Sequence, residues 1–368
     1  MTGTEIPLGT VRRLLPQPED SALKWLQYSL PPALGSVAIS DPAKIFSTEP
    51  PNLVDSATLS SIMCPPKRII DSLRSSLSQF SDIQSITCAY LSVTKQNERV
   101  PLFMLTYWFK LDNMRRTQQK LAVSFQTLEK FRSSPQTTPA SRTLADDVRV
   151  MLGMLPWQDS IRGFPLEMDS SYLSAFFGTE WLSSEHINLM MHLLENDTQT
   201  KGLSAVEFIT ETANFTTRLK QAHLNPDEYD TDQGYRWLSK IGQRLANGHS
   251  DRLALVANTD QQNHWVAILI DVRERLIWFG NSLKGDGVPT SLMNALKWWL
   301  YYHFAEPFRT HDLPITIQRD GYNCGIFAWQ ALEAALLKKP LITTNEPYTT
   351  RLKLFKRVVS RHQDTVGK

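Results

Sequence analysis

Three strand-like runs between residues 252 and 282 constrain the fold of this chain more than any other feature. RLALVAN, HWVAILIDV and RLIWFGNS follow one another closely and are rich in β-branched and aromatic residues. Only a short turn around Arg273 and Glu274 separates the second run from the third, which predicts an antiparallel hairpin. A helix is predicted at 290–304, and a short strand at 314–318 (PITIQ). We therefore expect an α+β fold built on a mixed sheet.

The run CGIFAWQALEAALLKK (324–339) predicts the helix that packs against this sheet. It is apolar on nearly every face, so it should be buried. Lys338 and Lys339 complement the negative end of the helix, and Pro340 ends it. Upstream, WLSSEHINLMMHLLEN (181–196) predicts a second helix with one apolar stripe.

The N-terminal part of the chain is harder to interpret. Residues 1–60 are rich in Pro, Ser and Thr and have weak periodicity, so we expect an irregular arm. Residues 61–145 predict a small α/β region of unknown role. A polar break at 133–143 marks its end, so we expect a C-terminal domain over 146–368. The elements predicted in the α/β region are helices at 66–80 and 114–131 and strands at 85–93 and 100–111.

Composition excludes several classes of function. The 39 basic and 37 acidic side chains nearly balance, at a formal net charge of +2, which gives no reason to expect a nucleic-acid partner. The short basic pairs Lys67-Arg68 and Arg115-Arg116 fit a solvated helix face. No stretch reaches the length of about 20 apolar residues that a membrane span needs, and no signal peptide is evident, so no membrane association is expected.

Only three cysteines occur, at Cys64, Cys88 and Cys324. An odd and sparse count argues against a disulfide framework and fits a reducing compartment, so we expect an intracellular protein of the nucleus or cytoplasm. Cys and His residues show no spacing typical of a metal site, and we expect neither a metal nor a cofactor.

Cys324 is the candidate nucleophile. It lies at the predicted start of a helix, where the helix dipole and free backbone N–H groups favour a thiolate and lower the pKa of the thiol. Gly325 leaves the sulfur uncrowded, and Gln318 can supply an amide donor for an oxyanion. A cysteine before a buried helix is more often a small core residue, so the case depends on its partners.

His264 and Asn281 are the candidate partners. His264 begins the second strand-like run and Asn281 ends the third, so the hairpin should bring their side chains together. The Asn281 oxygen would accept the imidazole Nδ1–H and leave Nε2 facing the thiol. Alternatively, His264 is a solvated residue at a strand end, and Asn281 is a turn residue beside Ser282.

These motifs, in this order, resemble the ubiquitin-like-protein-specific (SUMO) proteases of the adenoviral-protease-like clan. The residues that carry the resemblance are NHWVAILID, FGNSL, IQRDGYNCGIF and, upstream, WLSSEHINL. It covers about residues 175–340 and does not reach the N-terminal region. It implies a papain-like α+β fold of the adenoviral-protease-like type, with a buried catalytic-Cys helix. The implied activity is that of a cysteine peptidase in deSUMOylation or ubiquitin-like modifier processing.

The resemblance also implies roles for single residues. Cys324 would be the nucleophile, His264 the general base, and Gln318 the oxyanion-hole donor. Trp181 and Trp265 would flank a tunnel for the Gly-Gly tail of a ubiquitin-like modifier, the expected partner; the alternative is that both tryptophans fill core. Asn281 stands where the family usually has an aspartate, and Ser183-Ser184 where SUMO-directed members often carry Asn-Asp.

Two rival functions remain open at this point. One is a catalytically inactive module that binds a modifier on the same fold. The other is an acyltransferase that uses the same Cys-His machinery, as in some relatives of the clan. The two tryptophans and the Trp-Leu motif favour the peptidase.

Overall fold

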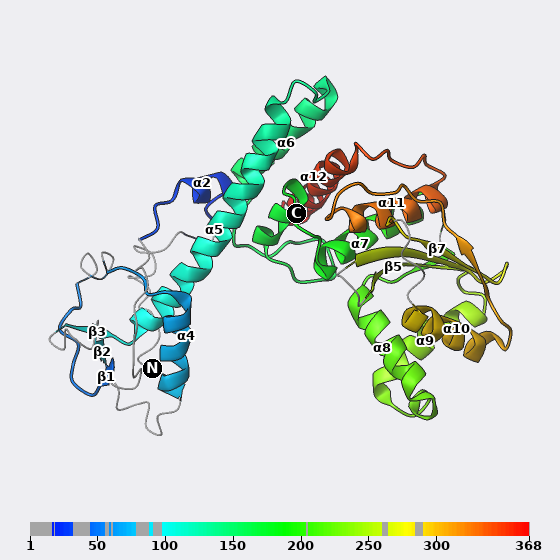
Figure 1. Cartoon of the computed structure of the whole chain (residues 1–368), viewed down its shortest axis with the longest axis horizontal. Helices are drawn as coiled ribbons and strands as arrows, with labels where there is room; N and C mark the ends of the chain where they lie inside the picture. Colours follow the sequence, from blue (N-terminus) through cyan, green and yellow to red (C-terminus); the bar gives the residue numbers. More distant parts are fainter. Residues whose placement is uncertain are drawn as a thin grey trace. The chain divides into compact units, whose positions relative to one another are not determined.

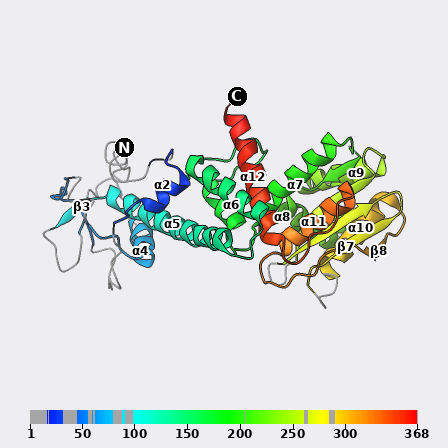
Figure 2. The same cartoon turned by 90° about the horizontal axis from the view of Figure 1, so that it is seen from above.

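The computed structural model describes residues 17, 19–31, 45–55, 59, 62–78, 88–90, 98–203, 205–259, 264–283 and 290–367. The chain divides into two compact units (Figures 1 and 2). The first holds residues 1–123 and 152–159, and the second holds 124–151 and 160–368. Two of the three dividing points lie inside helices and the third lies between residues 159 and 160, so none coincides with the polar break at 133–143.

In the first unit, a three-stranded antiparallel sheet is accompanied by helices. The sheet pairs β1 (Phe46–Ser47) with β2 (Cys88–Tyr90), and β2 with β3 (Arg99–Pro101). The helices are α2 (Ala22–Gln27), α4 (Lys67–Ser78) and the first part of α5 (Phe103–Ser133). The predicted helix at 66–80 is thus confirmed over α4, and much of the 1–60 arm lies outside the described residues.

The strand predicted at 100–111 is wrong beyond Pro101, because α5 begins at Phe103. The aromatic and β-branched content of this stretch favours a strand locally. Its buried positions nevertheless recur at helical spacing and continue into the predicted helix at 114–131, so one long helix buries them all. These positions are Met104, Leu105, Tyr107, Trp108, Leu111 and Met114.

The second unit is built on a mixed five-stranded sheet in the order β4-β5-β6-β7-β8. The outer pairs β4–β5 and β7–β8 are parallel, and β5–β6 and β6–β7 are antiparallel. The predicted hairpin around Arg273 and Glu274 is confirmed as β6–β7. The strands are β4 (Val206–Phe208), β5 (Arg252–Thr259), β6 (His264–Asp271), β7 (Leu276–Gly280) and β8 (Arg309–Asp312).

Helices cover both faces of this sheet (Figure 1). On one face, alternate residues of β5, β6 and β7 form a core with α8 (Thr212–Leu224), α9 (Arg236–Ala246) and α10 (Thr290–Phe304). On the other face, α11 (Cys324–Leu337) lies against β6 and β5, with α7 (Ser184–Thr200) and α12 (Pro347–Val366) packed on it. Both predicted helices, 181–196 and 324–339, are thereby confirmed in type.

The segment 314–318 was predicted as a strand, and this is wrong. The strand of this region is β8, and its last ladder contact is followed by a bond from Leu313 N to Phe279 O of 2.8 Å. Pro314 has no N–H to continue the ladder, so the chain leaves the sheet there. One further bond, from Gln318 N to Ser282 O, ties its end to the residue after Asn281.

Two helical segments before residue 146 pack within the second unit. The last ten residues of α5 and most of α6 (Pro139–Met154) belong to it. Leu128 is fully buried, Ser124 lies against Gly178, and the rings of Phe131 and Tyr348 are 4.7 Å apart. The predicted start of the C-terminal domain at 146 falls inside α6 and remains a prediction.

We expect a polypeptide of residues 146–368 to be less stable than one of residues 124–368. Loss of Leu128 and Phe131 would expose apolar surface worth about 3 kcal/mol. For a chain of this size, that corresponds to a fall in melting temperature of roughly 5–10 °C. Thermal unfolding followed by circular dichroism measures the difference. Equal melting temperatures would show that the α5–α6 segment contributes nothing to the second unit.

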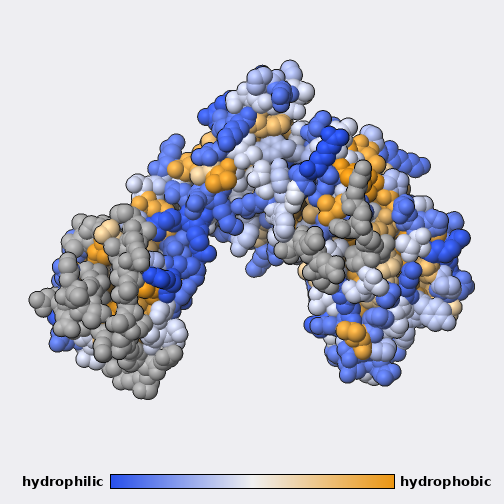
Figure 3. All heavy atoms as spheres, in the orientation of Figure 1, coloured by the Kyte–Doolittle hydropathy of each residue, from blue (hydrophilic) through white to orange (hydrophobic). Residues whose placement is uncertain are grey.

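The surface seen in Figure 3 is mainly hydrophilic, with apolar side chains gathered in small separate areas. Leu224, at the end of α8, is the most exposed large apolar side chain of the described residues, at 77%. Among the described helices, none is long and apolar enough to cross a membrane.

Candidate active site

The candidate nucleophile Cys324 is the first residue of α11 and is 4% exposed. The turn before it is organised by Asp320, whose carboxylate accepts bonds from Tyr322 N (3.0 Å), Asn323 N (2.9 Å) and Asn323 Nδ2 (3.0 Å). An aspartate that binds backbone amides two and three residues on is a common device for fixing a tight turn. Asp320 therefore sets the direction in which α11 starts.

Gly325 allows close packing around the nucleophile. A Cβ atom at this position would lie 2.8 Å from Ile187 Cδ1 of α7 and 3.3 Å from Trp265 Cδ1 of β6. A larger residue here would force the Ile187 side chain to shift. The start of α11 is thus held directly against the beginning of β6.

Opposing influences act on the Cys324 thiol. Burial raises the pKa of this thiol above its ordinary value. Hydrogen bonding from the backbone amides of Trp265 and Gly325, together with the positive charge of Arg351, lowers the pKa. Burial outweighs the others, so the lowered pKa expected from the helix start alone does not apply to the isolated protein.

His264 and Asn281 lie where the hairpin was expected to bring them. His264 is buried at the first position of β6, and Asn281 follows the last residue of β7. His264 Nε2 and Asn281 Oδ1 are 2.7 Å apart. The same oxygen accepts a bond from Leu283 N at 2.9 Å, which fixes the amide in place. Because an amide oxygen only accepts, Nε2 carries the proton of this hydrogen bond.

This geometry corrects the predicted ring nitrogen. From the sequence, Nδ1 is expected to face Asn281 and Nε2 the thiol, whereas Nε2 is the atom bonded to Asn281. The pairing of a histidine with an amide can be foreseen from strand register, but the ring orientation depends on side-chain torsions that register does not specify. Nδ1 is therefore the atom left for proton exchange with a thiol.

Two nearby carboxylates, Asp271 and Asp320, make other contacts and so do not orient His264 in place of Asn281. Asp271 is at the opposite end of β6 from His264, where it binds Arg252 Nε at 3.1 Å and accepts from Glu274 N at 3.1 Å. It thereby stabilises the β6–β7 turn. Asp320 is engaged in the turn before Cys324, which it shapes through its bonds to Tyr322 N and Asn323 N.

Gln318 lies between the end of β7 and the Asp320 turn. Its Oε1 accepts a bond from Ser282 Oγ at 2.8 Å, and its Nε2 donates to Asp320 O at 3.0 Å. These two bonds fix which end of the amide carries the N–H groups. The amide nitrogen of Gln318 carries two N–H groups, and the bond to Asp320 O uses one of them.

Trp181 and Trp265 line one cavity of about 460 Å³ but differ in exposure. Trp181 is 49% exposed, and its Nε1 donates to Gly321 O of the turn before Cys324. Trp265 is buried, and its Nε1 donates to Leu182 O at 2.8 Å. The other residues around the cavity are uncharged: Leu182, Ser183, Ser184, Ala213, Thr216, Thr217 and Asn258.

A buried arginine close to the nucleophile was missed by the sequence argument. Arg351 of α12 has no exposed surface and contacts the turn before Cys324. A signal for it exists in the sequence, because Arg351 falls in the apolar stripe of the helix at 347–366. The stripe consists of Leu354, Phe355, Val358, Val359 and His362. A charged residue in such a stripe indicates a buried polar role.

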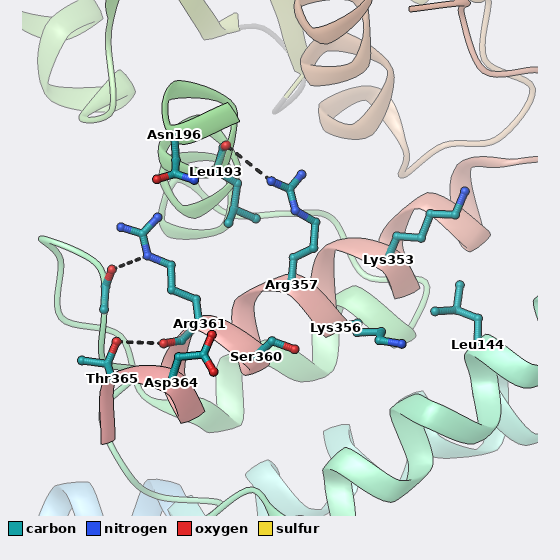
Figure 4. A pocket seen from close by; sticks show the side chains of 11 residues that line it. Leu144, Leu193, Asn196, Lys353, Lys356, Arg357, Ser360, Arg361, Asp364 and Thr365 are labelled. Carbon is teal, nitrogen blue, oxygen red and sulfur yellow. Dashed lines mark hydrogen bonds between the residues drawn. The ribbon is translucent and has the colours of Figure 1, made fainter. Parts of the chain in front are cut away.

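A larger cavity lies along α12 (Figure 4), with a volume of about 930 Å³. Three of its four cationic side chains are engaged: Arg357 binds Asp197 (2.7 Å), Lys356 binds Asp147 (2.6 Å), and Arg361 donates to a backbone carbonyl. The fourth is Lys353. Its lining includes none of the predicted site residues. Within the part of the chain that is described, no cluster of His, Cys, Asp or Glu could hold a metal ion.

Comparison with known proteins identifies the family. Residues 180–356 match the model of the Ulp1 protease family, C-terminal catalytic domain. No curated protein matches the chain's sequence.

Several solved structures are similar to part of this chain. One is the C-terminal Ulp1 protease domain in complex with Smt3, the yeast orthologue of SUMO, at 16% identity and a TM-score of 0.47; the match covers 62% of this chain and 97% of that chain. The Ulp1-like SUMO protease catalytic domain of Chaetomium thermophilum is 16% identical with a TM-score of 0.42, and the match covers 64% of this chain and 88% of that chain. The Xanthomonas campestris effector protein XopD, in its structure bound to ubiquitin, is 19% identical with a TM-score of 0.35, and the match covers 50% of this chain and 91% of that chain.

The family match extends over the Trp181 segment, the β6–β7 hairpin, the start of α11 and the first half of α12. The resemblance inferred from the motifs and the α+β fold class are confirmed: residues 180–356 belong to the Ulp1 protease family, as its C-terminal catalytic domain.

Proposed function

We propose that this protein is a cysteine peptidase or isopeptidase that cleaves after the C-terminal Gly-Gly of a ubiquitin-like modifier. The observation that carries the proposal is the 2.7 Å contact between His264 Nε2 and Asn281 Oδ1 at the open end of the β6–β7 hairpin. The residue next to His264, Trp265, supplies a backbone amide to the sulfur of Cys324. An oriented imidazole beside a cysteine at a helix start is the arrangement that nucleophilic catalysis needs.

In the proposed reaction, His264 Nδ1 takes the proton of the Cys324 thiol, and the thiolate attacks the carbonyl carbon of the last glycine. The oxyanion that forms is stabilised by backbone N–H groups at the start of α11 and by the second N–H of Gln318. The imidazolium then gives its proton to the leaving amine, which departs and leaves a thioester. Water, deprotonated by His264, hydrolyses the thioester and restores the thiol.

Asn281 has a defined part in this scheme. Its oxygen holds the Nε2–H of His264, so Nδ1 is presented as the base. Leu283 N fixes the amide from the other side. An amide orients the ring without adding charge, so the imidazolium receives less stabilisation than a carboxylate would give.

The cavity beside Trp181 and Trp265 is the proposed site for the Gly-Gly tail. Two indoles can pack on a flat peptide without side chains and exclude larger residues. None of the described residues that line the cavity is charged, so backbone hydrogen bonds and fit would select the tail. Trp181 also contacts the turn before Cys324, which supports a position of the tail beside the nucleophile.

We expect Trp181→Ala to lower kcat/KM several-fold, mainly by raising KM. The reason is that the exposed indole contacts substrate, while its bond to Gly321 O contributes less. Trp237→Ala, at a partly exposed tryptophan of α9, is the matched control and should resemble the parent. An unchanged KM in Trp181→Ala would contradict its placement in the tail site.

The proposal is tested with a panel of fluorogenic modifiers, each with its C-terminal Gly-Gly joined to a fluorophore. The panel contains SUMO, ubiquitin and other ubiquitin-like modifiers. Release of fluorophore from at least one, and none from matching substrates with Gly-Gly changed to Ala-Ala, supports a Gly-Gly peptidase. Tight binding of a modifier without turnover would favour the inactive binding module. Turnover of none, together with acetyl transfer from acetyl-CoA, would favour the acyltransferase.

A further inference from the structure

Arg351 is a buried cation, and within the described part of the chain its hydrogen bonds all go to neutral groups. Its guanidinium donates to Asn323 Oδ1 at 2.6 Å and to the backbone oxygens of four residues. Its side chain has no exposed surface, and burial lowers its pKa to about 10. A buried charge is costly unless its hydrogen bonds are satisfied, and these five contacts satisfy it. The four backbone acceptors are Ala175, Gly178, Glu180 and Tyr322, at 2.6, 3.2, 2.8 and 3.0 Å.

These acceptors belong to two segments that meet at the candidate site. Tyr322 and Asn323 are the last residues of the turn before Cys324. Glu180 immediately precedes Trp181, whose indole in turn binds Gly321 O. One side chain therefore joins the segment that carries the exposed tryptophan to the turn that carries the nucleophile. Among the described residues of α12, Arg351 alone donates hydrogen bonds to the turn before Cys324.

The nearest carboxylate does not pair with Arg351 directly. Asp320 binds the Nδ2 end of the Asn323 amide, while Arg351 binds its Oδ1 end, so the amide lies between the two charges. The titratable groups that act on Arg351 are Tyr322 and Asp320 from the turn, Tyr348 from α12 itself and Cys324 from α11. On β6, His264 precedes the Trp265 amide that reaches the sulfur. When Cys324 ionises, it adds a negative charge, besides that of Asp320, near a cation that has no direct carboxylate partner among the described residues.

We propose that Arg351 is a positioning residue of the site: it holds the Gly321–Asn323 turn against the Trp181 segment and supplies the fixed positive charge that stabilises the Cys324 thiolate. The inference rests on the proposed function only in that Cys324 is the nucleophile. Arg351 acts through Cys324 and touches no substrate. It offsets part of the burial that otherwise disfavours the ionised sulfur.

The test separates charge from hydrogen bonding with two variants of the full-length chain. Arg351→Lys keeps a positive charge but offers three donors in place of five, and Arg351→Gln loses the charge. The rate of alkylation of Cys324 by iodoacetamide is measured from pH 5 to pH 10 by mass spectrometry of the peptide that contains Cys324. The pH dependence of this rate gives the pKa of the thiol without any modifier substrate.

We expect Arg351→Gln to raise the pKa of the Cys324 thiol by about one pH unit, which slows alkylation below that pKa roughly ten-fold. Arg351→Lys should keep the pKa of the thiol near that of the parent and lower kcat/KM several-fold, since the turn is held by fewer bonds. Arg357→Gln is the matched control: Arg357 lies on the same helix, binds Asp197, and should leave both quantities unchanged.

Each outcome decides a part of the proposal. A thiol pKa in Arg351→Gln equal to that of the parent overturns the role of the charge, as does an equal rise in both variants. If Arg351→Gln fails to fold by circular dichroism, Arg351→Lys decides: a parent-like alkylation profile with lowered kcat/KM supports the proposal, and parent values of both overturn it. If no modifier is turned over, the proposed function fails, while the alkylation shift still tests Arg351.

Discussion

Replacement of Cys324 by alanine is expected to abolish turnover of every Gly-Gly substrate and to leave modifier binding intact. The sulfur is the only atom lost, and it forms the covalent bond in the proposed reaction. The side chain is small and 4% exposed, so the change leaves little empty space and α11 should begin as before. Turnover is measured with the fluorogenic panel, and binding by isothermal titration calorimetry with the unlabelled modifier.

The other two cysteines provide the controls for this result. Cys64 is a free, buried thiol of the first unit, and its Sγ lies near Trp108 O at 3.6 Å. Burial raises the pKa of Cys64, as expected of a structural cysteine. Cys64→Ala and Cys88→Ala should both retain parent turnover. If either abolishes activity while Cys324→Ala retains it, the nucleophile is wrongly assigned.

Replacement of Asn281 by alanine is expected to lower kcat/KM at least ten-fold, and up to about a hundred-fold. Without the Oδ1 acceptor, the His264 ring is no longer held with Nδ1 as the base, and the buried Nε2–H loses its partner. Because the fold does not depend on this side chain for packing, the loss should appear in kcat more than in KM. Steady-state kinetics on the best modifier substrate measures both.

Asn281→Asp should behave differently. A carboxylate can accept the same bonds from His264 Nε2 and Leu283 N, so the geometry is retained. Its negative charge stabilises the imidazolium, so the thiolate–imidazolium pair persists to higher pH. We therefore expect near-parent kcat/KM and an alkaline limb of the pH–rate profile that moves upward. A downward move would contradict the assigned contact.

Asp271→Ala is the matched control for both variants. Asp271 lies on the same strand as His264, but its bonds to Arg252 and the Glu274 amide serve the hairpin turn. This variant should lose some stability and keep its kcat/KM. Parent-like kinetics in Asn281→Ala, combined with collapse in Asp271→Ala, would show that the third member of the site is misassigned.

The parts of the site that sequence predicts are those set by strand register and helix starts. His264 and Asn281 are brought together because a short turn pairs β6 with β7 antiparallel, which follows from local sequence. Cys324 begins a helix because a buried apolar run follows a turn that Asp320 organises. Such features depend on residues close in the chain, so one sequence is enough to find them.

The parts that were missed depend on contacts between distant segments. Arg351 reaches back to Ala175, Gly178 and Glu180 on a chain segment over 170 residues away, and no local pattern specifies those partners. The ring nitrogen of His264 depends on torsions that only the packed site fixes. The helix at Phe103 was missed because its aromatic residues favour a strand locally, while tertiary packing selects a helix.

The central claim is that Cys324 attacks the carbonyl carbon of the last glycine of a modifier's Gly-Gly tail, and a covalent probe tests it most directly. The full-length protein is incubated with modifiers that carry a vinyl sulfone or propargylamide in place of the last carboxylate, and adducts are mapped by peptide mass spectrometry. The account predicts a one-to-one adduct on Cys324 with at least one modifier, formed more slowly by Asn281→Ala and absent in Cys324→Ala. An adduct on Cys64 or Cys88, or none with any modifier, would contradict it.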